Sequence, residues 1–300
     1  MSDSLESLSR KMGGARDLAS VVRTMKALAA SSVGQYETAV RSLVDYYRTV
    51  ELGLVACVRH NHAAAFSESE GNEAGAIGAV VFGSDQGLVG QFNDVLTDFA
   101  VRTLNTLPGE KEVWAVGERV HSRLADAGLP LAGLFTVPNS VAGITPLVGQ
   151  IQIEIEGSRA KGKCPHMYLF HNRPGPGASY QPASQRLLPL DEQWRGALTK
   201  LPWPTGNLPE VLSGAQPTLR ALVREYLFVS LFRTCAESLA SENTSRLVAM
   251  QRAEKNIDDL LETLTRNFNR LRQTSIDEEL FDVISGFEAL SVSESHALSI

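Results

Sequence analysis

The thirteen prolines of this 300-residue chain all lie between Pro108 and Pro217. The 107 residues before this stretch and the 83 residues after it contain none, and the only glycine after Pro217 is Gly286. At average usage the C-terminal stretch would hold about four prolines and about six glycines. Because both residues interrupt helices, their absence predicts two long terminal helices with a globular domain inserted between them.

Both ends of the chain also carry a seven-residue hydrophobic repeat. From Leu5 to Cys57, alternating steps of three and four residues meet an apolar residue at fifteen of sixteen positions, and Lys26 is the exception. From Leu219 to Leu271, thirteen of sixteen positions are apolar. The exceptions there are Arg233, Asn243 and Glu254. Repeats of this length predict a coiled coil, in which alanines on both stripes let the two backbones approach closely.

The inserted domain determines the direction of the two helices. One helix enters the domain and the other leaves it, so a pair formed by them is antiparallel. Matching the stripes end to end places Cys57 opposite Leu219 and Leu5 opposite Leu271. The stretch from Arg272 to about Leu290 then extends beyond its partner with an apolar face of its own, which predicts a contact with another protein. That face comprises Ile276, Leu280, Val283, Ile284, Phe287 and Leu290.

The central part reads as an α/β domain with a largely parallel sheet. The runs GAIGAVVFGS, KEVWAVG, LAGLFTVP and CPHMYLFHN predict strands, and IQIEIEG (residues 151–157) alternates with the period of a further strand. Helices are expected from SDQGLVGQFN to about Leu107 and over GERVHSRLADAG. A linker-like patch, SESEGNEAG, precedes the first strand, and a Pro-rich loop with one short strand follows the last. We therefore divide the chain into residues 1–62, 63–214 and 215–300.

The sequence contains no pattern typical of a catalytic, cofactor or metal site. Gly83, Gly87 and Gly90 follow the first strand, but their spacing matches neither nucleotide-binding fingerprint and the loop has no lysine. Ser84 and Asp85 fit a helix cap better than a nucleophile. We expect no cofactor and no metal. A net charge of -6 argues against a general nucleic-acid binder, and no apolar run is long enough to span a membrane.

Three segments stand out in the sequence: MKALAAS near the N-terminus, SDQGLVGQFN after the first strand, and the C-terminal stretch from SENTSRLVAM through NRLRQTSIDEEL to ISGFEAL. In their sequence, order and separation they resemble the gamma subunit of F-type ATP synthases. The resemblance covers nearly the whole chain and implies the central rotor shaft of the complex, which performs no catalysis itself. It implies contacts with the alpha and beta subunits, the epsilon subunit and the c-subunit ring. It also implies a peripheral complex on the cytoplasmic face of a bacterial inner membrane, with membrane association only through that complex.

The same resemblance suggests two sets of contact residues. Rotor–stator contacts are expected at Arg23, Met25, Lys26, Arg272, Gln273, Asp277 and Glu279. A turn facing the epsilon subunit and the c ring is expected at Ser84, Asp85, Gln86 and Gly87.

The sequence departs from the family pattern in several places. Gln86 stands where the family usually has arginine, Asp277 stands where many relatives have threonine, and the chain runs ten residues past the usual end. Two other interpretations remain open on the residues alone. A coiled-coil adaptor unrelated to ATPases would keep this fold without the rotor, and a small-molecule enzyme would use the α/β domain.

Overall fold

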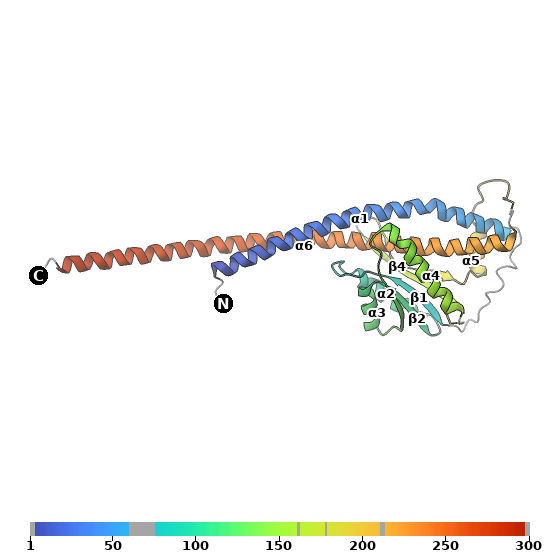
Figure 1. Ribbon diagram of the computed structural model, residues 1–300, viewed down its shortest axis with the longest axis horizontal. Coiled ribbons are helices and arrows are strands. Elements are labelled where there is room, and N and C mark those ends of the chain that lie inside the picture. The colour runs from blue at the N-terminus through green and yellow to red at the C-terminus, as the bar shows by residue number, and fades with distance from the viewer. Residues whose placement is uncertain (1–3, 60–75, 161–162, 178, 211–213, 298–300) are drawn as a thin grey trace. The chain divides into compact units, whose positions relative to one another are not determined.

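The structure is a computed structural model that describes residues 4–59, 76–160, 163–177, 179–210 and 214–297 (Figure 1). The chain forms two compact units, Met1–Lys26 with Met250–Ile300, and Ala27–Ala249. We call them the tip unit and the sheet unit. Helices α1 (Leu5–Arg59) and α6 (Ala215–Ala297) are 55 and 83 residues long and contribute to both units. The two long terminal helices expected from the proline distribution are thus confirmed.

The sheet unit contains five strands in the order β3-β2-β1-β4-β5. Strands β1 (Ile77–Phe82), β2 (Lys111–Val116), β3 (Leu131–Phe135) and β4 (His166–Pro174) pair in parallel. Strand β5 (Tyr180–Leu188) pairs antiparallel with β4 at the edge. All six residues of β1 are buried, as expected for a central strand covered on both faces. The prediction of a mostly parallel sheet is confirmed.

One face of the sheet packs against α2 (Phe92–Thr106) and α3 (Glu118–Asp126). The alternation of side chains along β1 sends Ile77, Ala79 and Val81 to this face. Leu96 of α2 and Leu124 of α3 are fully buried against them. These two helices are the ones that the sequence predicts after the first and second strands.

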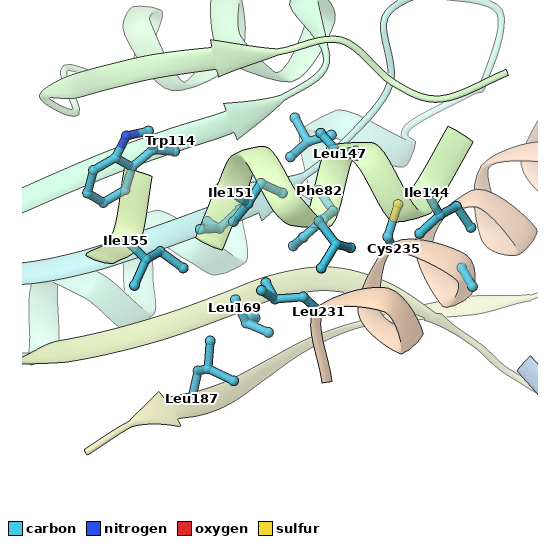
Figure 2. Close-up of a cluster of buried hydrophobic side chains, with 14 of the residues drawn as sticks. Phe82, Trp114, Ile144, Leu147, Ile151, Ile155, Leu169, Leu187, Leu231 and Cys235 are labelled. Carbon is cyan, nitrogen blue, oxygen red and sulfur yellow. The ribbon is translucent and has the colours of Figure 1, made fainter. Parts of the chain in front are cut away.

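The other face packs against α4 (Ile144–Ala160) and the part of α6 that lies in the sheet unit. Val80 and Phe82 of β1 point to this side. Figure 2 shows Ile151 and Leu147 of α4 and Leu231 of α6 among the side chains that converge there. A short 3-10 turn, η2 (Val141–Gly143), precedes α4. The terminal helix α6 is therefore part of the core of the α/β domain.

The prediction of a strand over residues 151–157 was wrong, because this segment belongs to helix α4. Ile151 and Ile155 are buried, whereas Ile153 between them is 69% exposed. Ile144, Leu147 and Val148 continue the buried set at helical spacing. The short alternation of isoleucines is thus part of a longer stripe with a period of 3.6 residues, and the longer pattern determines the structure.

The Pro-rich segment has more structure than the sequence suggests. Besides β5, which has nine residues, it contains helix α5 (Glu192–Thr199). The side chain of Asp191 caps this helix by accepting a hydrogen bond from the Trp194 backbone N–H at 2.9 Å. The linker-like patch at residues 67–75 lies outside the described residues.

Within the sheet unit, α1 and α6 pack against each other as an antiparallel pair. Cys57 and Leu219 belong to one buried cluster, as the end-to-end match of the stripes predicts. Farther from that end, Tyr36 of α1 packs in the same cluster as Leu239 of α6. The alanines expected at close backbone contacts, Ala29, Ala236 and Ala240, are all buried.

A polar network interrupts the apolar packing between α6 and β4. Glu237 is 4% exposed, and its carboxylate lies 2.8 Å from His171 Nε2. It also accepts hydrogen bonds from Arg233 Nε at 2.7 Å and Arg173 Nε at 3.2 Å. Arg233, an exception in the second stripe, additionally lies over the ring of Tyr47. Arg233 is thus a charged residue at an otherwise apolar heptad position because it donates a hydrogen bond to the buried carboxylate of Glu237.

Candidate functional site

The tip unit has a small apolar core between α1 and α6. Ala15, Ala19 and Val22 of α1 are buried against Met250 and Ile257 of α6. Met25, Ala253 and Leu261 pack around them and are partly buried. Two of the three α1 residues are alanines, so the helix axes can approach closely at this point. Met25, which is predicted to contact another subunit, is thus partly buried in this core and partly exposed to solvent.

Lys26 and Glu254, the charged exceptions in the two hydrophobic stripes of the tip unit, form an ion pair with each other. Lys26 Nζ lies 2.5 Å from Glu254 Oε2, and Arg23 Nε lies 3.0 Å from Glu254 Oε1. Arg23 also lies 3.7 Å from Asp258. Hydrogen bonds from Lys26 and Arg23 lower the pKa of Glu254. The predicted contact residues Arg23 and Lys26 are therefore held in place by α6, with Arg23 still more than half exposed.

The predicted contact residues on α6 are all exposed. Arg272, Gln273, Asp277 and Glu279 project from the helix, and the three charged residues form no ion pair with any residue that the structure describes. At about 100° per residue, Arg272 and Gln273 lie on the same side of the helix as Ile276. The structure thus places this arginine–glutamine pair beside an apolar stripe.

That stripe has no cover within the described part of the chain. Ile276, Leu280, Val283 and Ile284 are 46–69% exposed, and their spacing puts them on one side of α6. Phe281, which the sequence stripe did not include, is 69% exposed. Side chains from residue 286 onward, including Phe287 and Leu290, lie outside the description, although α6 continues to Ala297. The expectation that the α6 face is unpaired beyond Arg272 is confirmed for residues 276–284.

The turn at residues 84–87 has an interior half and an exposed half. Ser84 is fully buried; its backbone N–H donates to Asn93 Oδ1 at 3.0 Å, and its Oγ donates to the Gln86 carbonyl oxygen at 2.8 Å. Gln86 and Gly87 are exposed, as is Leu88 at 63%. The surface available to a partner is therefore residues 86–88.

Asp85 ties this turn to the neighbouring elements. Its carboxylate accepts hydrogen bonds from the backbone N–H groups of Glu118 and Val137, each at 3.0 Å. Glu118 is the first residue of α3, so Asp85 caps a helix, although not the one that follows it directly in the sequence. A side chain at Gly117 would meet the Ser84 backbone at 2.6 Å. The turn is thus rigidly positioned.

Sequence reasoning missed the acidic partners of the predicted basic residues. Glu254 stood out only as an exception to the hydrophobic stripe, and Asp258 did not stand out at all. The charges themselves could have identified Glu254. Lys26 is the basic exception in the first stripe, Glu254 is the acidic exception in the second, and the predicted register places them within one helical turn of each other.

The described residues contain no group of three or more His, Cys, Asp or Glu side chains that could hold a metal ion. Within the same residues, no helix combines the length and hydropathy that a membrane span requires. All three cysteines are free and buried.

Comparison with known proteins identifies similar chains. A family model described as ATP synthase matches residues 4–290. The ATP synthase gamma chain of Nitrosomonas eutropha is 25% identical over 296 residues, which cover 93% of this chain and 97% of that one. The gamma chain of Nitrosomonas europaea is 26% identical over 223 residues, covering 71% and 74%. In a cryo-EM structure of the rotor of Euglena gracilis mitochondrial ATP synthase, one chain matches with a TM-score of 0.61 and 17% identity, covering 91% and 98%. That last likeness bears on the fold alone.

Proposed function

The chain belongs to the ATP synthase family, and we propose that it is the gamma subunit, the central rotor shaft of an F-type ATP synthase. In this role it couples ion flow through the membrane sector to ATP synthesis or hydrolysis in the catalytic hexamer. The observation that carries the proposal is the family match over residues 4–290, which includes both terminal helices and the domain between them. The alignment with gamma chains along almost the whole length supports it.

In this proposal the chain performs no chemistry of its own. Its partners are the alpha and beta subunits, the epsilon subunit and the c-subunit ring. It is held at the cytoplasmic face of a bacterial inner membrane through the complex. The coiled-coil segments are residues 1–62 and 215–300, and residues 63–214 form the domain next to the epsilon subunit and the c ring.

A rotor can couple two processes only if its contacts differ between the states of its partners. We assign those contacts to Arg23, Met25 and Lys26 on α1 and to Arg272, Gln273, Asp277 and Glu279 on α6. The exposed apolar residues Ile276, Leu280, Val283 and Ile284 support this assignment, because a stripe of this kind is buried in an assembly. We assign the contacts with the epsilon subunit and the c ring to the turn at Ser84–Gly87, through its exposed residues Gln86 and Gly87.

The double variant Arg272→Ala and Gln273→Ala tests the proposal in the assembled complex. Both side chains are exposed, so the variant is expected to fold normally and to lose ATP-driven rotation and proton pumping. Arg102→Ala on α2 is the matched control, since Arg102 is also exposed and lies outside the proposed contacts. Rotation and pumping at wild-type rates in the double variant would contradict the assigned contacts. Failure of the wild-type chain to assemble with a catalytic hexamer would contradict the function itself.

A further inference from the structure

A polar cavity of about 210 Å³ lies beside the 84–87 turn, entirely within the sheet unit. Residues from α1, α6 and two loops line it. The exposed side chains of Gln86 and Asn139 belong to its outer rim, whereas Tyr36 and Glu242 are each only 4% exposed and lie in its interior. The volume is smaller than the roughly 300–1,000 Å³ of a typical cofactor or drug-sized site, so the cavity suits a single polar head group.

Glu242 in this cavity has one carboxylate oxygen with a partner and one without. Oε1 accepts a hydrogen bond from Arg246 Nη2 at 2.6 Å. Oε2 is buried and has no hydrogen-bond partner among the described residues. Buried carboxylate oxygens are normally paired, because desolvation without a donor is costly. Among the described residues this oxygen therefore lacks the donor that a buried carboxylate normally has.

The charge of the cavity is unbalanced. Its lining contains two carboxylates, Asp85 and Glu242, and one guanidinium, Arg246. Burial raises the pKa of Glu242, Arg246 opposes this shift, and the nearby charge of Asp85 adds to it. The two backbone N–H groups that Asp85 binds carry no net charge. One positive charge would balance the site.

We propose that this cavity receives a guanidinium or ammonium group from the side chain of a neighbouring subunit. Such a group supplies both the N–H donor that Glu242 Oε2 lacks and the missing positive charge. The amide side chains of Gln86 and Asn139 at the rim offer oxygen acceptors to the remaining N–H groups. The inference rests on the proposed function, because it requires that the chain be a subunit of a complex.

A structure of the assembled complex with resolved side chains tests this directly. We expect an arginine or lysine of another subunit with a nitrogen within about 3.2 Å of Glu242 Oε2. A cavity that holds only water, a bare metal ion or a free amine would overturn the inference while leaving the assembly intact. Absence of assembly would instead overturn the proposed function, so the two failures are distinguishable.

Variants give a second, independent test through the rate at which labelled chain leaves the complex. Glu242→Gln keeps the shape and removes the charge, and should raise that rate about tenfold or more. Glu110→Gln, an exposed carboxylate elsewhere in the sheet unit, is the matched control and should change the rate less than about twofold. An unchanged rate in the Glu242 variant would overturn the inference.

Asn139→Arg covers the case in which the Glu242 variant fails to fold. Asn139 is exposed and lies outside the contacts assigned above, so the substitution leaves the interior packing and those contacts as they are. The new guanidinium at the rim can pair with Glu242 and displace the incoming cation, so dissociation should again be about tenfold faster. Dissociation at the wild-type rate would contradict the proposed occupant.

Discussion

The buried carboxylate of Glu237 should make the sheet unit strongly sensitive to one substitution. Burial raises the pKa of Glu237, but hydrogen bonds from His171 and Arg233 and the charges of these groups outweigh that effect and lower the pKa to about 2. At about 1.36 kcal/mol for each tenfold change in proton affinity, the difference between this pKa and the ordinary value of 4.5 corresponds to about 3 kcal/mol. We expect Glu237→Gln, which keeps the shape and removes the charge, to lower the free energy of unfolding at pH 7 by about this amount.

The pH dependence of this loss follows from the direction of the shift. Because the pKa of Glu237 is lower in the folded chain, its carboxylate contributes its full stabilisation above the unfolded value of about 4.5. That stabilisation disappears as the pH falls toward about 2, where the folded state also takes up the proton. Below that pH, protonated glutamate and glutamine have the same charge, so the two proteins should be equally stable.

Urea unfolding of the full chain, followed by tryptophan fluorescence, measures this difference. Wild type and Glu237→Gln are compared at several pH values between 7 and 2. The contributions of the other carboxylates are common to both proteins, so they cancel in the difference in unfolding free energy. Arg173→Gln is a second variant for comparison. Because the Arg173 side chain is half exposed, this substitution should lower the free energy of unfolding less than Glu237→Gln does. A difference in unfolding free energy that stays constant from pH 7 to pH 2 would refute the reasoning, as would a difference near zero at pH 7.

Two further pairs of substitutions, each a test variant with its control, examine the packing and the backbone conformation. Ile151→Ala empties a fully buried position and should cost about 3 kcal/mol in urea unfolding, whereas Ile153→Ala, on the exposed side of the same helix, should change stability by less than about 0.5 kcal/mol. Equal costs would argue against the helical register. Gly117→Ala should lower the thermal midpoint and cost about 2 kcal/mol or more, because the backbone has a φ of 115° and a Cβ would meet Ser84 at 2.6 Å. Gly87→Ala, which meets nothing within 4 Å, is its control, and a similar loss in both variants would contradict this explanation.

The helices and most strands could be predicted because their signals are local. A proline-free stretch with a sustained heptad repeat has few alternatives to a long helix, and β1 reads as a short apolar run bounded by glycines. Residues 151–157 were assigned incorrectly because three alternating isoleucines fit a strand over a short window. Only the packing of Ile144 and Leu147 with Ile151 on the sheet shows which period applies.

The candidate contact residues were found by resemblance, and the structure adds what surrounds them. Their exposure on α6 agrees with the unpaired stripe that the repeat predicts beyond Arg272. The partner of Arg23 and Lys26 could not be assigned from the sequence, because Glu254 is more than 200 residues away. A shift of one helical turn in the register of α1 against α6 would place another residue opposite them. The polar cavity was equally hidden, since Asp85 and Glu242 come from elements far apart in the chain.

The sequence by itself determined where helices can run and where two of them can pair, because proline, glycine and hydrophobic spacing act through the backbone of each segment. Only the tertiary structure decided that Ser84 is interior, that α6 completes the core of the sheet unit, and that one oxygen of Glu242 has no partner among the described residues. The physical reason is that burial and charge pairing depend on which distant segments meet, and that choice is made by the packing of the whole unit.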